Sequence, residues 1–186
     1  ANGIMGLYPS SGIVYKDGRE LPLNNPKAAL SQGIAFVSED RRGVGLLLDE
    51  SIENNIAFTS AQVQDRFLRK RLPWTSLQVR DNEAIRQYAL ETIKELDIRC
   101  QGPEQPVRRL SGGNQQKVCL ARALALSPEV LFASEPTRGI DVGAKSLVLD
   151  LLVKFNREFG MTVVITSSEL AELRMVCDRI AIVYQG

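Results

Sequence analysis

The chain has 186 residues, with 23 Lys and Arg against 22 Asp and Glu, and no histidine. Its length suits one ordinary domain, and its near-zero net charge gives no general attraction to nucleic acid or anionic lipid. The lack of histidine excludes Ser-His-Asp and Cys-His nucleophile systems and zinc sites with histidine ligands. Three cysteines without C-x-x-C spacing indicate reduced thiols of a cytosolic protein. No apolar run is long enough to span a membrane, and no signal peptide is recognised.

The first fifty residues predict short strands, one turn and one short helix. Residues 11–15 predict a strand, and the Asp-Gly pair that follows them is a strong turn signal. A short helix is predicted over residues 27–31. Residues 34–37 form a compact apolar run, typical of a strand that is buried on both faces. The charged loop 38–43 follows that strand directly.

The middle of the chain predicts helices. Ser51 is expected to cap a helix through about residue 58. Residues 62–100 are predicted to be helical, and their clearest helix starts at Asp81. Residues 66–74 are basic and aromatic. This segment could bind phosphate or lipid, and it could equally be the exposed basic face of a helix that binds a partner.

The last third alternates between helices and strands. Apolar runs bounded by helical patterns are typical of a parallel sheet covered by helices, so we predict an α/β protein. The expected elements are a helix over residues 114–126, a strand over 130–133, a helix over 144–159, a strand over 162–166, a short helix from 169 and a strand over 180–183.

Two segments carry residues suited to phosphate chemistry. Ser111, Gly112 and Gly113 stand at a predicted helix start, where exposed N–H groups and the helix dipole form an anion site. Taken alone, this segment is better explained as an N-cap with a glycine turn. Glu135 directly follows a predicted strand, which places a carboxylate at the edge where α/β sheets bind ligands. A second strand ends at Thr166 and leads into two serines and a glutamate.

Together these segments resemble the ATP-binding subunits of ABC transporters, and in particular the second half of the duplicated ATPase of sugar and nucleoside importers. The resemblance covers nearly the whole chain. Its four motifs are the signature motif at 110–117, the Walker B strand at 130–135, the D-loop at 139–141 and the Q-loop region at 39–46.

The resemblance implies a P-loop-NTPase-like ABC ATPase domain over residues 1–186, with a mainly parallel sheet and a helical subdomain inserted at about 62–109. That subdomain would face a membrane-spanning permease, with Arg66, Arg69, Lys70 and Arg71 as contact residues or as a solvated face. The partners implied are this permease, a first ATPase half and, indirectly, a solute-binding protein. The location implied is cytoplasmic, peripheral to the inner face of the cell membrane.

In this family two ATPase domains meet head to tail and share each nucleotide. The resemblance therefore implies ATP and Mg²⁺ as cofactors of the assembled dimer. Glu135 would be the catalytic base or water-orienting carboxylate. The D-loop residues Gly139 and Asp141 would reach across the interface. The residues implied to bind the partner's ATP are Leu110, Ser111, Gly112, Gly113, Asn114 and Gln115.

The sequence departs from the family pattern at four places. The phosphate loop G-x-x-x-x-G-K-[ST] is absent, so we expect the N-terminal phosphate-loop part to be missing. Glu39 replaces the Q-loop glutamine, Ser134 the Walker B aspartate and Ser168 the switch histidine. No residue is assigned as a metal ligand. These departures predict that the nucleotide site on this half's own strands is degenerate.

The leading hypothesis is an ATP-binding and ATP-hydrolysing C-terminal half of an importer for a sugar or related solute, inactive as an isolated chain. The alternative is a non-hydrolytic coupling domain that only completes the partner's ATP site and contacts the permease. A third class, an ABC-type ATPase acting on DNA, predicts a coiled-coil insertion or a strongly basic surface. Neither is visible, so no nucleic-acid partner is predicted.

Overall fold

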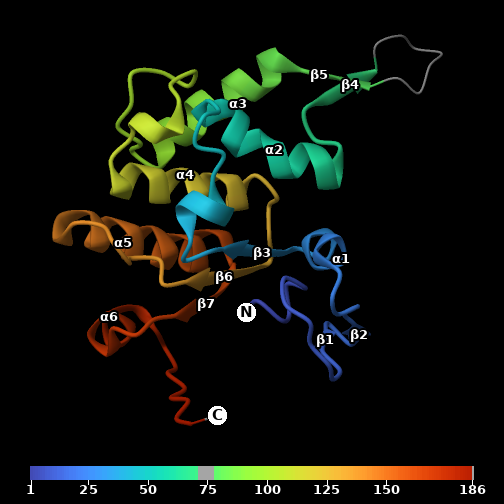
Figure 1. Ribbon diagram of the computed structural model, residues 1–186, viewed down its shortest axis with the longest axis vertical. Helices are drawn as coiled ribbons and strands as arrows, with labels where there is room; N and C mark the ends of the chain where they lie inside the picture. The colour runs from blue at the N-terminus through green and yellow to red at the C-terminus, as the bar shows by residue number, and fades with distance from the viewer. Residues whose placement is uncertain (71–77, 186) are drawn as a thin grey trace.

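The computed structural model describes residues 1–70 and 78–185. A three-stranded parallel sheet lies at its centre, with strand order β3 (Ile34–Val37), β6 (Val130–Ser134) and β7 (Thr162–Thr166) (Figure 1). The other elements, in chain order, are β1 (Tyr15–Lys16), β2 (Arg19–Glu20), α1 (Pro26–Ser31), the short π-helix η1 (Arg41–Gly45), α2 (Ile52–Gln64), β4 (Leu68–Lys70), β5 (Gln78–Arg80), α3 (Asn82–Glu95), the 3₁₀ turn η2 (Val107–Arg109), α4 (Gly112–Leu124), α5 (Val142–Phe159) and α6 (Leu170–Val176).

The parallel sheet confirms the predicted α/β class. Val37 pairs with Ala133, and Ser134 pairs with Thr166. Because all three strands run the same way, their carboxyl ends meet at one edge of the sheet. The loops that follow the three strands are therefore brought together at that edge.

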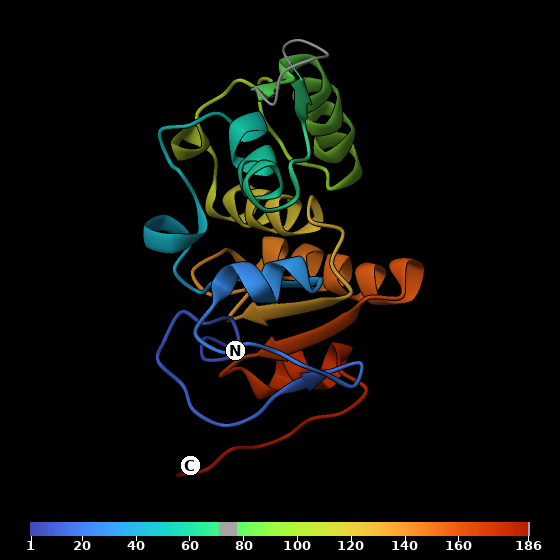
Figure 2. The same ribbon diagram turned by 90° about the vertical axis from the view of Figure 1, so that its right-hand side faces the viewer.

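Helix α4 lies at the centre of the core. It packs against α2 on one side and against β3 and α5 on the other, so the helices α2 and α3 form a layer beyond it (Figures 1 and 2). Val118, Leu120 and Ala121 of this helix have no exposed surface. Burial of such apolar side chains contributes about 1.5–3 kcal/mol each for the larger ones. Because α4 is packed along its whole length, the position of its N-terminus is fixed.

Side-chain caps start the helices where the sequence predicts them. Ser51 Oγ accepts a hydrogen bond from the Asn54 amide at 3.1 Å, and Asp81 Oδ1 accepts one from the Ala84 amide at 3.1 Å. Each satisfies an amide that has no partner inside its helix. The turn after β1 is also confirmed, since Asp17 has φ 52° and the following glycine has φ 73°, as a two-residue hairpin turn requires.

The prediction that residues 62–100 are helical throughout is wrong. Helix α2 ends at Gln64, its C-cap Asp65 has φ 52°, and the β4–β5 hairpin separates α2 from α3. Arg66 turns inward, where its Nη1 donates to the Ala125 carbonyl at 2.6 Å and its guanidinium lies 4.4 Å from the Tyr88 ring centroid. These contacts hold the chain in a turn. Arg66 is thereby a packing residue, whereas Arg71 and Trp74 lie outside the described residues.

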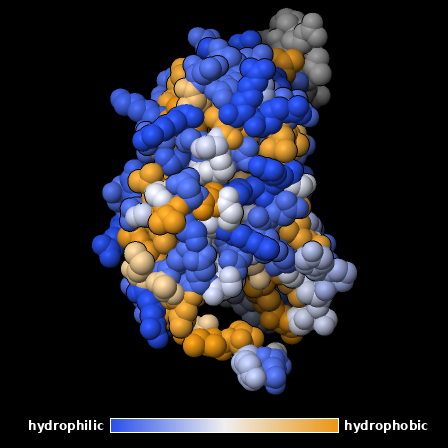
Figure 3. Space-filling model, turned by 60° about the vertical axis from the view of Figure 1, so that its left-hand side comes forward, coloured by the Kyte–Doolittle hydropathy of each residue, from blue (hydrophilic) through white to orange (hydrophobic). Residues whose placement is uncertain are grey.

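The strand predicted over 180–183 is also wrong. A run of β-branched residues favours a strand, but a strand needs a neighbour for its hydrogen bonds. In the described part of the chain this segment pairs with no strand, and Ile182 and Val183 are about four-fifths exposed. It leaves a cavity of about 650 Å³ against α5 and β7. Figure 3 shows hydrophobic residues around a hollow at the lower end of the molecule.

None of the helices in the described residues is both long and apolar enough to cross a membrane.

Candidate functional site

The carboxyl edge of the sheet brings Glu135 and Ser168 into contact. Glu135 follows β6 with φ 43°, a left-handed conformation that is uncommon outside glycine, and its amide donates to the Thr166 carbonyl at 2.8 Å. This backbone turn aims the carboxylate at the loop after β7. There Oε1 accepts from the Ser168 amide at 2.8 Å, and Oε2 contacts the Ser168 hydroxyl at 3.4 Å. Two neutral groups, rather than a cation, hold the carboxylate.

Ser134 is engaged in a similar way. Its hydroxyl accepts a hydrogen bond from Thr166 Oγ1 at 3.2 Å, across the paired ends of β6 and β7. A hydroxyl carries no charge, so it supports a divalent cation far less well than a carboxylate does. In the described residues no cluster of three acidic or cysteine side chains could hold a metal ion. Ser134 therefore supplies no carboxylate for Mg²⁺ at this edge.

Glu39 also lies in this region, in the loop after β3. Its Oε2 forms an ion pair with Arg138 Nη1 at 3.4 Å, and both side chains are about half exposed or more. An exposed pair of this kind contributes about 0–1 kcal/mol at most. Sequence reasoning did not single out Arg138, although its place between the Walker B strand and the D-loop could have done so.

The second group of predicted residues lies at the N-terminus of α4. Ser111 is exposed and caps the helix, with Oγ 3.4 Å from the Asn114 amide and 2.9 Å from Asn114 Nδ2. Asn114 Oδ1 in turn accepts from the Arg99 amide at 2.9 Å. This chain of bonds fixes the Ser111 hydroxyl at the positive end of the helix dipole, where an anion is stabilised.

The two glycines after Ser111 are required by packing. A Cβ on Gly113 would lie 2.7 Å from the Ala144 Cβ, and one on Gly112 would lie 3.3 Å from the Gly139 carbonyl oxygen. The start of α4 therefore packs directly against the loop before α5. Asp141 belongs to that loop, where its exposed side chain caps α5 by accepting from the Ala144 amide at 2.9 Å.

Leu110 and Gln115 point away from this surface. Leu110 is 7% exposed and Gln115 is 3% exposed. The Gln115 side-chain amide donates to the Leu110 carbonyl at 3.2 Å and to the Val107 carbonyl at 3.4 Å. In this arrangement Gln115 stabilises the turn that presents Ser111.

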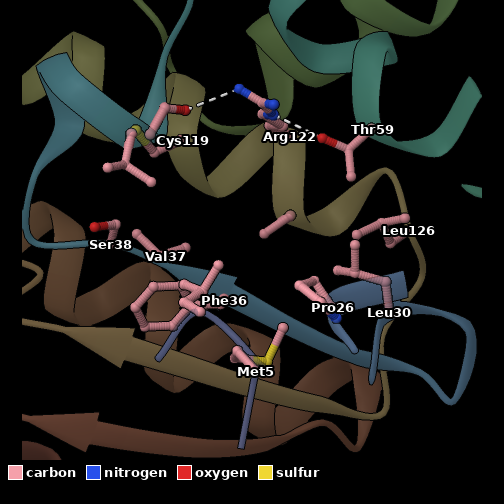
Figure 4. Close-up of a pocket in the computed structure, with 14 residues that line it drawn as sticks. Met5, Pro26, Leu30, Phe36, Val37, Ser38, Thr59, Cys119, Arg122 and Leu126 are labelled. Carbon is pink, nitrogen blue, oxygen red and sulfur yellow. Dashed lines mark hydrogen bonds between the residues drawn. The ribbon is translucent and has the colours of Figure 1, made fainter. Parts of the chain in front are cut away.

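Burial decides the chemistry of the cysteine on α4. Cys119 is buried, and this burial raises the pKa of its thiol to about 12. The nucleophilic thiolate is therefore scarce at neutral pH. Cys119 lines a cavity of about 200 Å³ between α4 and β3, together with Arg122 (Figure 4). Neither residue belongs to the two groups above.

The loop 135–141 joins the two groups of predicted residues. Glu135 at its start lies with Ser134 and Ser168, Gly139 lies against Gly112 of α4, and Asp141 at its end caps α5. The structure thus brings together Ser134, Glu135 and Ser168 in one place and Ser111, Gly112, Gly113, Gly139 and Asp141 in the other.

The solved structures similar to this chain are ATP-binding cassettes. One is a dimeric cassette in a post-hydrolysis state bound to ADP and phosphate, with a TM-score of 0.69 and 27% identity, covering 94% of this chain and 71% of the other. A nucleotide-free cassette from an ABC transporter has a TM-score of 0.71 over 95% of this chain, and its 18% identity shows the fold alone.

Curated relatives are named ribose import ATP-binding protein RbsA. One from Bacillus cereus is 37% identical over 98% of this chain, and one from Rhizobium meliloti is 40% identical over 100% of it. This chain spans 35% and 34% of their lengths, about a third in each case. A family model described as "ABC transporter" matches residues 1–138. The chain therefore belongs to the ABC transporter family and has the fold of its ATPase domains.

Proposed function

We propose that this chain is the C-terminal ATPase half of an importer for a sugar or related solute. It completes the ATP site of a partner half, and its own nucleotide site is degenerate. The names of the relatives, which refer to ribose import, support the solute class. The observation that carries the proposal is the contrast between the α4 N-terminus, where the exposed Ser111 caps the positive end of a helix, and the sheet edge, where the Glu135 carboxylate bonds Ser168.

The α4 N-terminus fits a phosphate group. Ser111 is exposed, Gly112 is partly buried and Gly113 is buried, and neither glycine has a side chain of its own beside the first amides of the helix. We infer that these groups contact the γ-phosphate of ATP bound mainly by the partner half. Asn114 orients Ser111, Leu110 and Gln115 support the turn, and Gly139 and Asp141 extend the same surface. ATP bound there supplies the phosphoryl group that is transferred to water.

The sheet edge is less suited to bind a nucleotide. Glu135 is a carboxylate that could orient water, and Ser168 contacts both of its oxygens. Glu39 and Arg138 are paired with each other. Because Mg²⁺ does not fit Ser134, we derive no step through a metal at this edge, and any Mg²⁺ would be held by the partner's site.

The layer of α2 and α3 is proposed as the surface for the permease. Of this layer, α3 and the end of α2 belong to the segment at about 62–109, and Arg69 and Lys70 of the β4–β5 hairpin are exposed. This contact would place the chain in the cytoplasm at the inner face of the membrane, and a solute-binding protein would act only through the permease. The non-hydrolytic alternative shares this geometry and differs only in giving Glu135 no role.

The proposal is tested by mixing this chain with an ATPase half that carries an intact phosphate loop. We expect Mg-ATP hydrolysis by the mixture to exceed that of the partner alone, and calorimetry to detect no tight Mg-ATP binding by this chain alone. The mixture with the Ser111→Arg variant is the matched control, because the large side chain blocks the anion surface. Tight binding by the isolated chain would reject the degenerate site, and an unstimulated partner would reject completion in trans.

A further inference from the structure

Arg41 contacts both halves of the proposed phosphate-facing surface. It is the first residue of η1, in the connection that follows β3, and it is partly buried. Its Nη2 donates to the Gly139 carbonyl at 3.2 Å, and its Nη1 contacts Gln116 Oε1 at 3.5 Å. Gln116 belongs to the second turn of α4, and Gly139 belongs to the loop before α5. One guanidinium therefore spans the two segments that present Ser111 and Asp141.

The surroundings of Arg41 leave it few other roles. Among the described residues it forms no ion pair with a carboxylate, and its acceptors are a carbonyl and an amide oxygen. Burial lowers the pKa of the Arg41 guanidinium, but arginine remains charged in proteins. A partly desolvated cation is costly unless its donors are bonded. Breaking either bond without replacement is therefore unfavourable.

Two glycines make room for this side chain. A Cβ on Gly139 would lie 3.3 Å from Arg41 Nη2, and one on Gly112 would lie 3.9 Å from the same atom. Gly139 also has φ +68°, a conformation that other residues rarely adopt. The backbone at both positions thus approaches the guanidinium closely enough to be held by it.

The loop that carries Arg41 is itself anchored on α4 at its other end. Arg122 Nη1 donates to the Gly45 carbonyl at 3.0 Å, and its Nε donates to Thr59 Oγ1 at 2.7 Å (Figure 4). The loop from Arg41 to Gly45 is therefore fixed to the same helix at both ends. Arg41 acts from a short, anchored loop rather than from a free surface.

We propose that Arg41 is a positioning residue that holds the start of α4 and the loop 139–141 in one arrangement, so that Ser111 and Asp141 face the same phosphate. The identity of the bound group rests on the proposed function. The contacts of Arg41 with Gly139 and Gln116 do not depend on it. The positioning depends on the planar fork of arginine, which holds two separate donors in fixed directions, whereas a lysine ammonium is a compact point charge.

Hydrogen exchange on the full chain, without nucleotide, tests the positioning. We expect Arg41→Gln and Arg41→Lys each to speed exchange by about tenfold at the α4 N-terminus and in residues 138–144, as the loss of one net hydrogen bond predicts. Exchange in β6 should not change. The matched control is Arg42→Gln, which removes the same charge from an exposed neighbour. Unchanged exchange in both Arg41 variants, an increase spread over the whole chain, or full retention by Arg41→Lys would overturn the inference.

ATP hydrolysis by the mixture with a partner half tests the consequence. Both Arg41 variants should lower kcat by about tenfold, because misplaced groups lose transition-state contacts, while Arg42→Gln should not. An Arg41 variant with local loosening but a normal kcat would overturn the role in catalysis. If the unmodified mixture shows no ATP hydrolysis, the proposed function fails, and the exchange data still decide the positioning separately.

Discussion

The sheet edge and the α4 N-terminus both carry serine hydroxyls, but the two regions differ in their electrostatics. At the edge, the Glu135 carboxylate is occupied by Ser168, and the Ser134 hydroxyl is bonded to Thr166. At the α4 N-terminus, Ser111 is exposed, and Gly113 packs where no side chain would fit. The edge carries the negative charge of Glu135, whereas the α4 N-terminus presents the exposed Ser111 hydroxyl at the positive end of a helix dipole. The difference supports the proposal that the α4 N-terminus, rather than the sheet edge, contacts an anion.

The largest effect on stability is expected at Gly113. A Cβ there would lie 2.7 Å from the Ala144 Cβ, so Gly113→Ala must push α4 and α5 apart. Overpacking of this kind costs about 1–3 kcal/mol, and the better helix propensity of alanine returns up to about 1 kcal/mol. We expect a net loss of unfolding free energy in urea denaturation.

Gly143→Ala is the matched control for that measurement. Its Cβ would meet only Asp141 Oδ1, at an ordinary 3.5 Å, so the variant should be neutral or slightly more stable. Equal stability of the Gly113 and Gly143 variants would show that the signature glycines are not required by packing.

A smaller difference is expected between two serines. Ser111→Ala removes a helix cap and should lower the unfolding free energy by about 1 kcal/mol. Ser168→Ala should cost less than about 0.5 kcal/mol, because the Ser168 amide still holds Glu135 and the hydroxyl is exposed. Urea denaturation of both variants measures the difference. A larger loss at Ser168 would mean that the sheet edge, not the α4 N-terminus, depends on its hydroxyl.

The smallest effect concerns pH near the sheet edge. Lys145 donates a hydrogen bond to Glu169 at 2.5 Å, and this bond lowers the pKa of the Glu169 carboxyl below its usual 4.5. A lowered folded-state pKa adds stability that is present above the unfolded pKa and is lost as pH falls through the folded value. The thermal midpoint should therefore drop below about pH 4.5.

Lys145→Gln provides the control for this pH dependence. Without the lysine the pKa of Glu169 should return toward its usual value, so the fall of the midpoint should be shallower. Because the Glu169 side chain is about half exposed, the difference should be small. Identical profiles for the two proteins would contradict the assigned partner.

The local parts of the fold could be predicted from the sequence. Apolar runs such as Ile34–Val37 predict the buried strands, and Ser51, Asp81 and Ser111 mark helix starts because a cap acts within three residues. The strand prediction for residues 180–183 is wrong, because a strand also needs a partner strand, which no local pattern shows.

Contacts between distant residues could not be predicted in this way. Glu135 and Ser168 are 33 positions apart, and Glu39 and Arg138 are 99 apart. Both pairs exist only because parallel strands bring their carboxyl ends to one edge. Arg41 lies 98 positions from Gly139 and was visible in the sequence only as part of a charged loop. The motifs therefore indicated which residues matter, and the structure supplied what each of them contacts.

The most direct test of the contrast between the α4 N-terminus and the sheet edge compares Ser111→Arg with Glu135→Gln in the mixture with a partner ATPase half. Loss of an oriented contact to transition-state charge costs a factor of about 10² or more, so Ser111→Arg should reduce kcat by at least that much. Glu135→Gln should leave most of the rate, because the nucleotide site on this chain's own strands contributes little to ATP hydrolysis. Comparable losses in the two variants would contradict the account.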